Sequence, residues 1–233
     1  MNFHAGFDTD QFPGLAQLQW LKANTNLQWC GYYLAPAPSH GDRSWMGNRA
    51  ALVAQGWGLL PIFLGQQTIG PGSHDVHGGQ GSTDGLAAVQ LMHDEGFPPR
   101  SYVFIDWEDG SALGADSKDY LAAWATAVNA AGYQPGIYCS HLLADAMASI
   151  LAGVQPPCDG RIWAWKVAQT NTHDYTCAPD GFPCADPTLC GYDAAVVWQC
   201  EQNCVLSLPG APSETMSADL STSSLADPSA AAA

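Results

Sequence analysis

The stretch SYVFIDWEDG, residues 101–110, decides the fold, because a run of β-forming residues ends directly in three carboxylates. Side chains alternate between the two faces of a strand. Asp106 and Glu108 therefore share one face with Tyr102 and Phe104, while the apolar residues between them share the other face. The pattern predicts a buried strand that carries two carboxylates together at its carboxyl end.

Strand-like and helix-like segments alternate along the rest of the chain. We expect strands at residues 3–8, 29–35, 58–65, 101–108, 134–140, 161–169 and 195–202, and helices at residues 14–23, 44–55, 83–96, 117–132 and 141–153. Five successive β–α units imply a parallel sheet, either closed into a barrel or open and doubly wound.

The closed barrel is the favoured α/β architecture, because no GxGxxG or P-loop pattern follows any expected strand. A barrel places functional residues at the carboxyl ends of its strands. We predict a single barrel domain over residues 1–220. The Ser/Ala-rich residues 221–233 are expected to form a disordered tail.

A second expected strand, HAGFD, also ends in a carboxylate, Asp8. Carboxylates that crowd a partly dry site cannot all ionise freely, so one pKa rises and supplies a proton donor at neutral pH. Such acid pairs carry out glycoside hydrolysis. Acidic residues after a strand are otherwise solvated loop or turn residues, which we expect for Asp109 beside Gly110. For Asp106 and Glu108 we favour a functional role.

The charge balance limits the partners of the chain. Seven Lys and Arg residues stand against a net charge of −15, which argues against binding to nucleic acid or to anionic membranes. No apolar run reaches the roughly 18 residues of a membrane span. The first residues show neither the basic nor the apolar region of a signal peptide.

Eight cysteines are distributed unevenly, and their spacing favours disulfides over zinc. Cys30 and Cys139 fall in strand-like runs and are expected to be buried free thiols, whereas the loop-rich last third carries the candidates for disulfides: Cys158, Cys177, Cys184, Cys190, Cys200 and Cys204. His74 and His77 form an HxxH pair without a placed third ligand, so we expect no metal site and no cofactor.

Several side chains on or just after strands are candidates for contacting a sugar, although core packing is the alternative for each aromatic ring. The candidates are Tyr33, Tyr138, Trp163, Trp165 and Trp198, with Gln66 and Gln67 as candidate hydrogen-bonding residues. By alternation, Tyr138 is expected to face the barrel interior.

Taken together, the motifs GFDTDQFP, GLLPIFLGQQ, GSTDGLAAV, FIDWE, GIYCS, WAWKVAQ, VVWQ and ADLS give the chain a resemblance over nearly its whole length. It resembles the glycoside hydrolase family 25 muramidases, and more closely the related glycoside-hydrolase-like domains of uncharacterised function. The resemblance implies an irregular (β/α) TIM-type barrel with fewer than eight helices. Trp107 and Cys200 depart from the family pattern, which commonly has a small aliphatic residue and a Tyr there.

By the same resemblance, four acidic residues line the groove: Asp8, Asp106, Glu108 and Asp219. Glu108 would protonate the glycosidic oxygen, and Asp106 would orient the N-acetyl group or stabilise the developing cation. Asp8 and Asp219 would shape the electric field and hold water or sugar hydroxyls.

The sequence therefore predicts a lysozyme-like glycosidase that cleaves bacterial peptidoglycan. The alternatives are a glycosidase for another bacterial glycan and a non-catalytic glycan-binding domain of the cell wall. We expect a monomer that is secreted or lies in the cell envelope or periplasm. A secreted antibacterial effector would also have a neutralising immunity-type partner protein.

Overall fold

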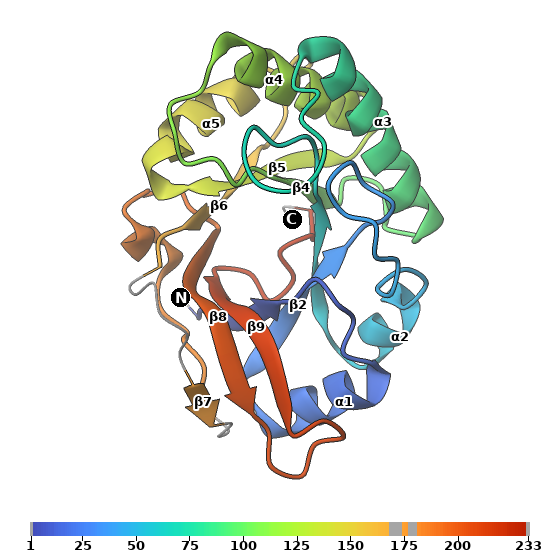
Figure 1. Cartoon of the computed structure of the whole chain (residues 1–233), viewed down its shortest axis with the longest axis vertical. Helices are drawn as coiled ribbons and strands as arrows, with labels where there is room; N and C mark the ends of the chain where they lie inside the picture. Colours follow the sequence, from blue (N-terminus) through green and yellow to red (C-terminus); the bar gives the residue numbers. More distant parts are fainter. Residues whose placement is uncertain (1, 168–173, 177–180, 232–233) are drawn as a thin grey trace.

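A closed ring of eight β-strands forms the centre of the computed structural model, which describes residues 2–167, 174–176 and 181–231 (Figure 1). In ring order the strands are β1 (His4–Asp8), β2 (Leu27–Tyr33), β3 (Gly58–Phe63), β4 (Tyr102–Asp106), β5 (Gln134–Ser140), β6 (Arg161–Trp165), β8 (Val197–Ser207) and β9 (Thr215–Ser223). All neighbours are parallel except β9, which runs antiparallel to both β8 and β1 and closes the ring. The short strand β7 (Asp174–Thr176) pairs with β8 outside the ring. The predicted α/β barrel is confirmed.

Fewer than eight helices cover the barrel, as expected. Within the described residues the α-helices are α1 (Leu15–Asn24), α2 (Arg49–Ala54), α3 (Gly78–Asp94), α4 (Ala115–Ala130) and α5 (Ala144–Ala152), and the 3-10 helices are η1 (His141–Leu143) and η2 (Pro187–Cys190). Helices α3, α4 and α5 gather on one side of the barrel, whereas the β8–β9 hairpin lies on the opposite side (Figure 1). None of the helices in this part of the chain is both long and apolar enough to cross a membrane.

The starts of α2 and α3 differ most from the prediction, each by five residues. Helix α3 begins five residues before the expected start because its glycines allow close packing on α4: a Cβ atom at Gly81 would lie 2.2 Å from the backbone oxygen of Tyr120. Helix α2 begins at Arg49, and the hydroxyl of Ser44, the expected first residue, accepts a hydrogen bond from the backbone N–H of Phe12 (3.0 Å).

The faces of β4 follow the predicted alternation. Phe104 packs inside the barrel against Trp163, with ring centroids 6.3 Å apart. Trp107 is 1% exposed and packs beside Tyr120 of α4, away from the interior. Glycine makes room for the interior rings, since a Cβ at Gly136 would lie 2.4 Å from the Phe104 ring.

Residues 221–231 of the expected disordered tail are instead ordered against the barrel, which extends past the predicted domain boundary at residue 220. Strand β9 continues to Ser223. Beyond it, Arg161 donates a hydrogen bond to the carbonyl of Pro228 (2.7 Å), and Tyr102 N–H donates to the carbonyl of Ser229 (2.8 Å). The C-terminal segment thus lies within the outline of the ring (Figure 1). The segment makes these contacts through its own backbone carbonyls, so its side-chain composition could not predict them.

The prediction of disulfides is wrong for the described cysteines, all of which are free thiols. Cys30 and Cys139 are buried, as expected, but so are Cys190, Cys200 and Cys204. A buried thiol packs as a small apolar side chain, which accounts for cysteines in the core without pairing. Cys177 and the end of the strand expected at residues 161–169 fall outside the described residues.

Candidate active site

Four carboxylates meet at the carboxyl-terminal mouth of the barrel. Asp8 ends β1 and lies directly opposite Asp219 on the antiparallel strand β9. Asp106 ends β4, and Glu108 follows two residues later. Asp8 and Asp106 are only 6% and 7% exposed, whereas Glu108 is exposed. The sequence predicted the first three from strand ends, and Asp219 from the motif ADLS.

The space around the Asp8 side chain depends on a glycine in the adjacent strand. A Cβ atom at Gly31 would lie 2.6 Å from the Asp8 Cβ, so the adjacent strand needs glycine there. The Tyr33 hydroxyl donates a hydrogen bond to Asp8 Oδ2 (2.9 Å). Asp8 Oδ1 and Asp106 Oδ1 are both buried without a hydrogen-bond partner. Buried acceptors without a donor carry a free-energy cost, which protonation or a ligand relieves.

The pKa of each of these carboxyls is raised. Burial is the largest cause in every case, since removal from water penalises the charged form. Like charge adds to it: Asp219 further raises the pKa of Asp8 and of Glu108, and Glu108 further raises that of Asp106. Glu108 is exposed as a residue, and partial burial of its carboxyl is still the largest cause of its raised pKa. The mouth therefore retains protons at pH values where isolated carboxyls ionise.

Asp219 is braced by two donors that the sequence did not identify. Gln199 Nε2 donates to Asp219 Oδ2 (2.6 Å), and the backbone N–H of Asn203 donates to Asp219 Oδ1 (2.7 Å). Asn203 has a positive φ of 55° and lies where β8 loses its regular register with β9. Such irregularities redirect backbone groups near active sites. The Tyr138 hydroxyl donates to Gln199 Oε1, which joins Tyr138 to this group.

Gln67 fixes the backbone that carries the Asp-x-Glu pair. Its side-chain Nε2 donates to the carbonyl of Asp106 (2.8 Å), and its Oε1 accepts from the N–H of Glu108 (3.2 Å). The Gln67 side chain is 3% exposed. One buried amide thus holds both ends of the peptide segment between the two acids.

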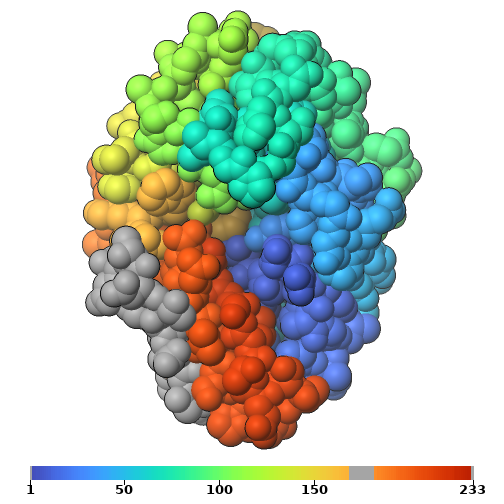
Figure 2. Space-filling view, viewed as in Figure 1, coloured from blue at the N-terminus to red at the C-terminus, as the bar shows by residue number. Residues whose placement is uncertain are grey.

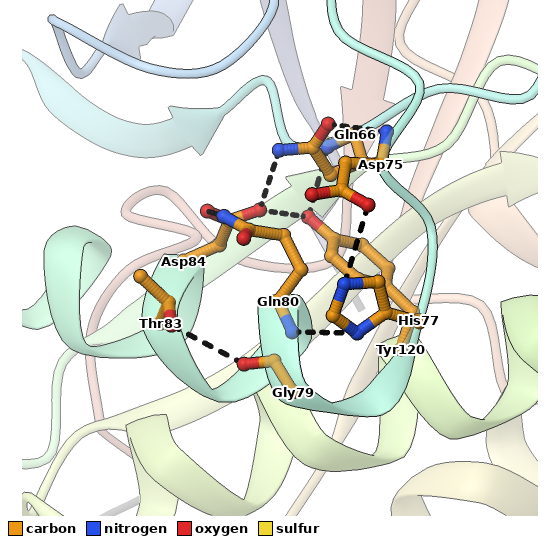
Figure 3. A network of polar contacts seen from close by, with 8 residues as sticks. All are labelled: Gln66, Asp75, His77, Gly79, Gln80, Thr83, Asp84 and Tyr120. Atoms are coloured by element: carbon orange, nitrogen blue, oxygen red, sulfur yellow. Dashed lines mark hydrogen bonds and ion pairs between the residues drawn. The ribbon is translucent and has the colours of Figure 1, made fainter.

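The neighbouring Gln66, predicted to contact substrate, does not reach the mouth. Its Nε2 donates to Asp84 Oδ2 (3.2 Å), and its Oε1 accepts from the N–H of Asp75 (2.9 Å). Figure 3 shows this network, buried at Gln66, Asp84 and Tyr120, in which the Tyr120 hydroxyl and Gln80 also donate to Asp84. The side chain faces the α3–α4 packing, because adjacent residues after the strand point in different directions.

The predicted aromatic residues divide into four groups, three of which lie at or below the mouth. Tyr33 and Tyr138 lie in the mouth, with their hydroxyls on Asp8 and Gln199. Trp163 is 2% exposed and packs against the Tyr138 ring, so it forms part of the floor. Trp165 follows on the same face and is half-buried at the rim.

Trp198 does not lie in the mouth. It precedes Gln199 and therefore faces the outside of the barrel, where its Nε1 donates to the carbonyl of Lys166 (3.0 Å). Neither the HxxH pair nor the carboxylates form a metal site: within the described ranges, no group of three His, Cys, Asp or Glu residues is arranged to hold a metal ion.

An irregular barrel with buried acids at its mouth defines a glycoside-hydrolase-like protein. The chain matches the model of the Rv2525c-like, glycoside hydrolase-like domain over residues 19–189, and it therefore belongs to this family. This agrees with the expected likeness to glycoside-hydrolase-like domains; the matching model is not that of glycoside hydrolase family 25 itself. No curated protein matches the chain.

Solved structures with the same fold include proteins of several organisms. The spore cortex lytic enzyme SleM of Clostridium perfringens is 11% identical, with a TM-score of 0.59 over 95% of this chain and 67% of that one. The Tat-secreted protein Rv2525c of Mycobacterium tuberculosis is 13% identical, with a TM-score of 0.57 over 97% and 96% of the two chains. The catalytic domain of endolysin ply40 from bacteriophage P40 of Listeria monocytogenes is 14% identical, with a TM-score of 0.54 over 96% and 94%. At these identities the likeness shows the fold alone.

Proposed function

We propose that this protein is a glycoside hydrolase that cleaves the glycan strands of bacterial peptidoglycan, with Glu108 as the general acid. The observation that carries the proposal is the convergence of Asp8, Asp106, Glu108 and Asp219 at the barrel mouth, each with a raised pKa. Membership of a glycoside hydrolase-like family supports the reaction class. The shared fold of a cortex lytic enzyme and an endolysin supports the substrate.

Glu108 suits the acid role because it combines exposure with proton retention. A glycosidic oxygen in the mouth can reach an exposed side chain, and the raised pKa keeps its carboxyl protonated at higher pH. Gln67 holds the Glu108 backbone N–H, which limits the positions open to the acid. The buried Asp106 beside it would orient the N-acetyl group of the sugar.

We further propose a substrate-assisted route. Glu108 gives its proton to the glycosidic oxygen while the anomeric carbon–oxygen bond breaks and the acetamido oxygen bonds to the anomeric carbon. Water then attacks this carbon, the acetamido bond breaks, and the water proton returns to the Glu108 carboxylate. Asp8 and Asp219 would stabilise the positive charge and hold water or sugar hydroxyls.

Mass spectrometry of soluble fragments released from purified peptidoglycan tests the proposal, with wild type compared to Glu108→Gln. We expect fragments ending in reducing N-acetylmuramic acid from wild type and a loss of at least about 100-fold in the variant, the lower end of general-acid catalysis. Full activity of Glu108→Gln would remove Glu108 from the role of acid. Binding to wall material without any release would favour the non-catalytic alternative.

A place in the cell envelope or outside the cell is part of this proposal, supported by the Tat-secreted relative. The monomeric state and a neutralising partner protein stay predictions.

A further inference from the structure

A second hollow lies beside the acidic mouth and continues from it. A cavity of about 270 Å³ contains Asp8 and Asp219, and an adjoining one of about 440 Å³ shares three of its lining residues, Thr9, Asp10 and Ser217. We call the adjoining cavity the side hollow; its other walls include Phe12, Gln17, Ser213 and Met216. Its volume falls within the range of about 300–1,000 Å³ typical of ligand sites.

The walls of the side hollow are held in place by buried side chains. Gln17 is only 2% exposed, and its amide makes two hydrogen bonds to the backbone of Ser213 at the β8–β9 turn (3.1 and 2.9 Å). On the other wall, Trp45 Nε1 donates to the carbonyl of Thr9 (3.0 Å). These hydrogen bonds hold the hairpin and the N-terminal segment together, and the two segments lie side by side on this face of the molecule (Figure 2). Sites of this preorganised kind bind with a smaller entropic cost.

The chemistry of the lining selects a neutral occupant. Among the described residues that line the side hollow, Asp10 is the single charged one. An anionic group in the side hollow would therefore meet the like charge of Asp10. Phe12 and Met216 are half-buried and offer an apolar surface to the C–H face or acetamido methyl of a sugar.

We propose that the side hollow binds a neutral N-acetylglucosamine unit of the same glycan strand, next to the two sugars whose linkage is cut; this rests on the proposed function. Peptidoglycan strands alternate N-acetylglucosamine with N-acetylmuramic acid, whose lactyl carboxylate is anionic. If the bond after N-acetylmuramic acid is cut, the neutral unit beside the reacting pair lies on the non-reducing side. The strand then crosses the β1–α1 loop, and cleavage occurs within strands.

Calorimetric binding to the Glu108→Gln variant tests this, with peptide-free peptidoglycan strands of one and three disaccharides as probes. We expect the longer strand to bind at least about tenfold more tightly. Ser213→Phe, which fills the side hollow from an exposed position, should reduce this ratio to near one. Phe12→Ala should reduce it as well, and Ser149→Phe on the exposed face of α5 serves as the matched control.

The outcomes separate the two proposals. An unchanged length preference in Ser213→Phe and in Phe12→Ala, with wild type still releasing wall fragments, would overturn the side hollow and leave the proposed function standing. If wild type releases no fragments and neither strand binds, the proposed function fails, and the sugar site fails with it.

Discussion

Replacing Gln67 by Met tests whether the buried amide positions the acid pair. Met has a similar length and no charge, so it removes both hydrogen bonds without leaving a large cavity. The carbonyl of Asp106 and the N–H of Glu108 then lose their partner. An unsatisfied buried group costs about 1–3 kcal/mol, and since the Glu108 N–H is only partly buried we expect a total loss of about 2–4 kcal/mol in the free energy of unfolding.

Gln66→Met is the matched control. Gln66 is the adjacent residue, is also 3% exposed, and also makes two side-chain hydrogen bonds, but to Asp84 and Asp75 instead of the acid pair. Both variants should therefore lower the thermal midpoint by comparable amounts, at about 2–4 °C per kcal/mol for a chain of this size. A difference in kcat between the two variants therefore reflects the position of the acid pair and not a difference in stability.

The assay is the rate of fragment release from solubilised peptidoglycan, well below both thermal midpoints. A displacement of about 1 Å in a catalytic group can cost about 100-fold in rate, so Gln67→Met should lower kcat by roughly that factor with little change in KM. Gln66→Met should stay within about fivefold of wild type. Equal losses of kcat in the two variants, or wild-type kcat in Gln67→Met, would refute the positioning role.

Three further perturbations have defined outcomes. Asp106→Asn should raise the free energy of unfolding by about 1–3 kcal/mol at pH 7 and leave it unchanged at pH 3.5. Because folding raises the pKa of Asp106, this carboxyl destabilises the wild type only as the pH rises above its pKa in the unfolded state. Urea unfolding of both proteins at the two pH values measures the difference. Tyr33→Phe removes a hydrogen bond that lowers the pKa of Asp8, so the Asp8 titration followed by carboxyl NMR should move to higher pH; a move to lower pH would contradict the assignment. Arg161→Ala loses both the hydrogen bond to Pro228 and the stacking on an interior ring, and should lower the free energy of unfolding by about 2–4 kcal/mol, whereas an unchanged thermal midpoint would mean that the C-terminal segment does not stabilise the barrel.

Period-two alternation was enough to predict the face of β4 that carries Asp106 and Glu108, and the carboxylate that ends β1. It could not identify Gln199 or Asn203 as partners of Asp219, since that contact depends on the irregular pairing of β8 with β9. An irregular register of this kind cannot be predicted from the residue composition of the strands.

The sequence also could not predict the direction of side chains that follow the end of a strand. Gln66 and Gln67 are identical in type and adjacent, yet one enters the α3–α4 network and the other holds the acid pair. The predictions of disulfides and of a disordered C-terminal segment were wrong for a related reason. The closed ring buries most of the cysteines and supplies backbone hydrogen-bond partners to the C-terminal segment, and neither effect can be predicted from composition.

Strand β9, which closes the ring, determines when the barrel can close during synthesis of the chain. Strand β9 pairs with β1, and residue 229 pairs with β4, so the ring needs segments that are synthesised more than 120 residues apart. Domains fold as units during synthesis, and long-range pairing slows folding. A nascent chain in which β9 is still inside the ribosome therefore cannot bring Asp219 to Asp8 in a closed barrel. The acidic cluster therefore forms only after β9 has been synthesised, and nascent chains that lack this strand cannot form it.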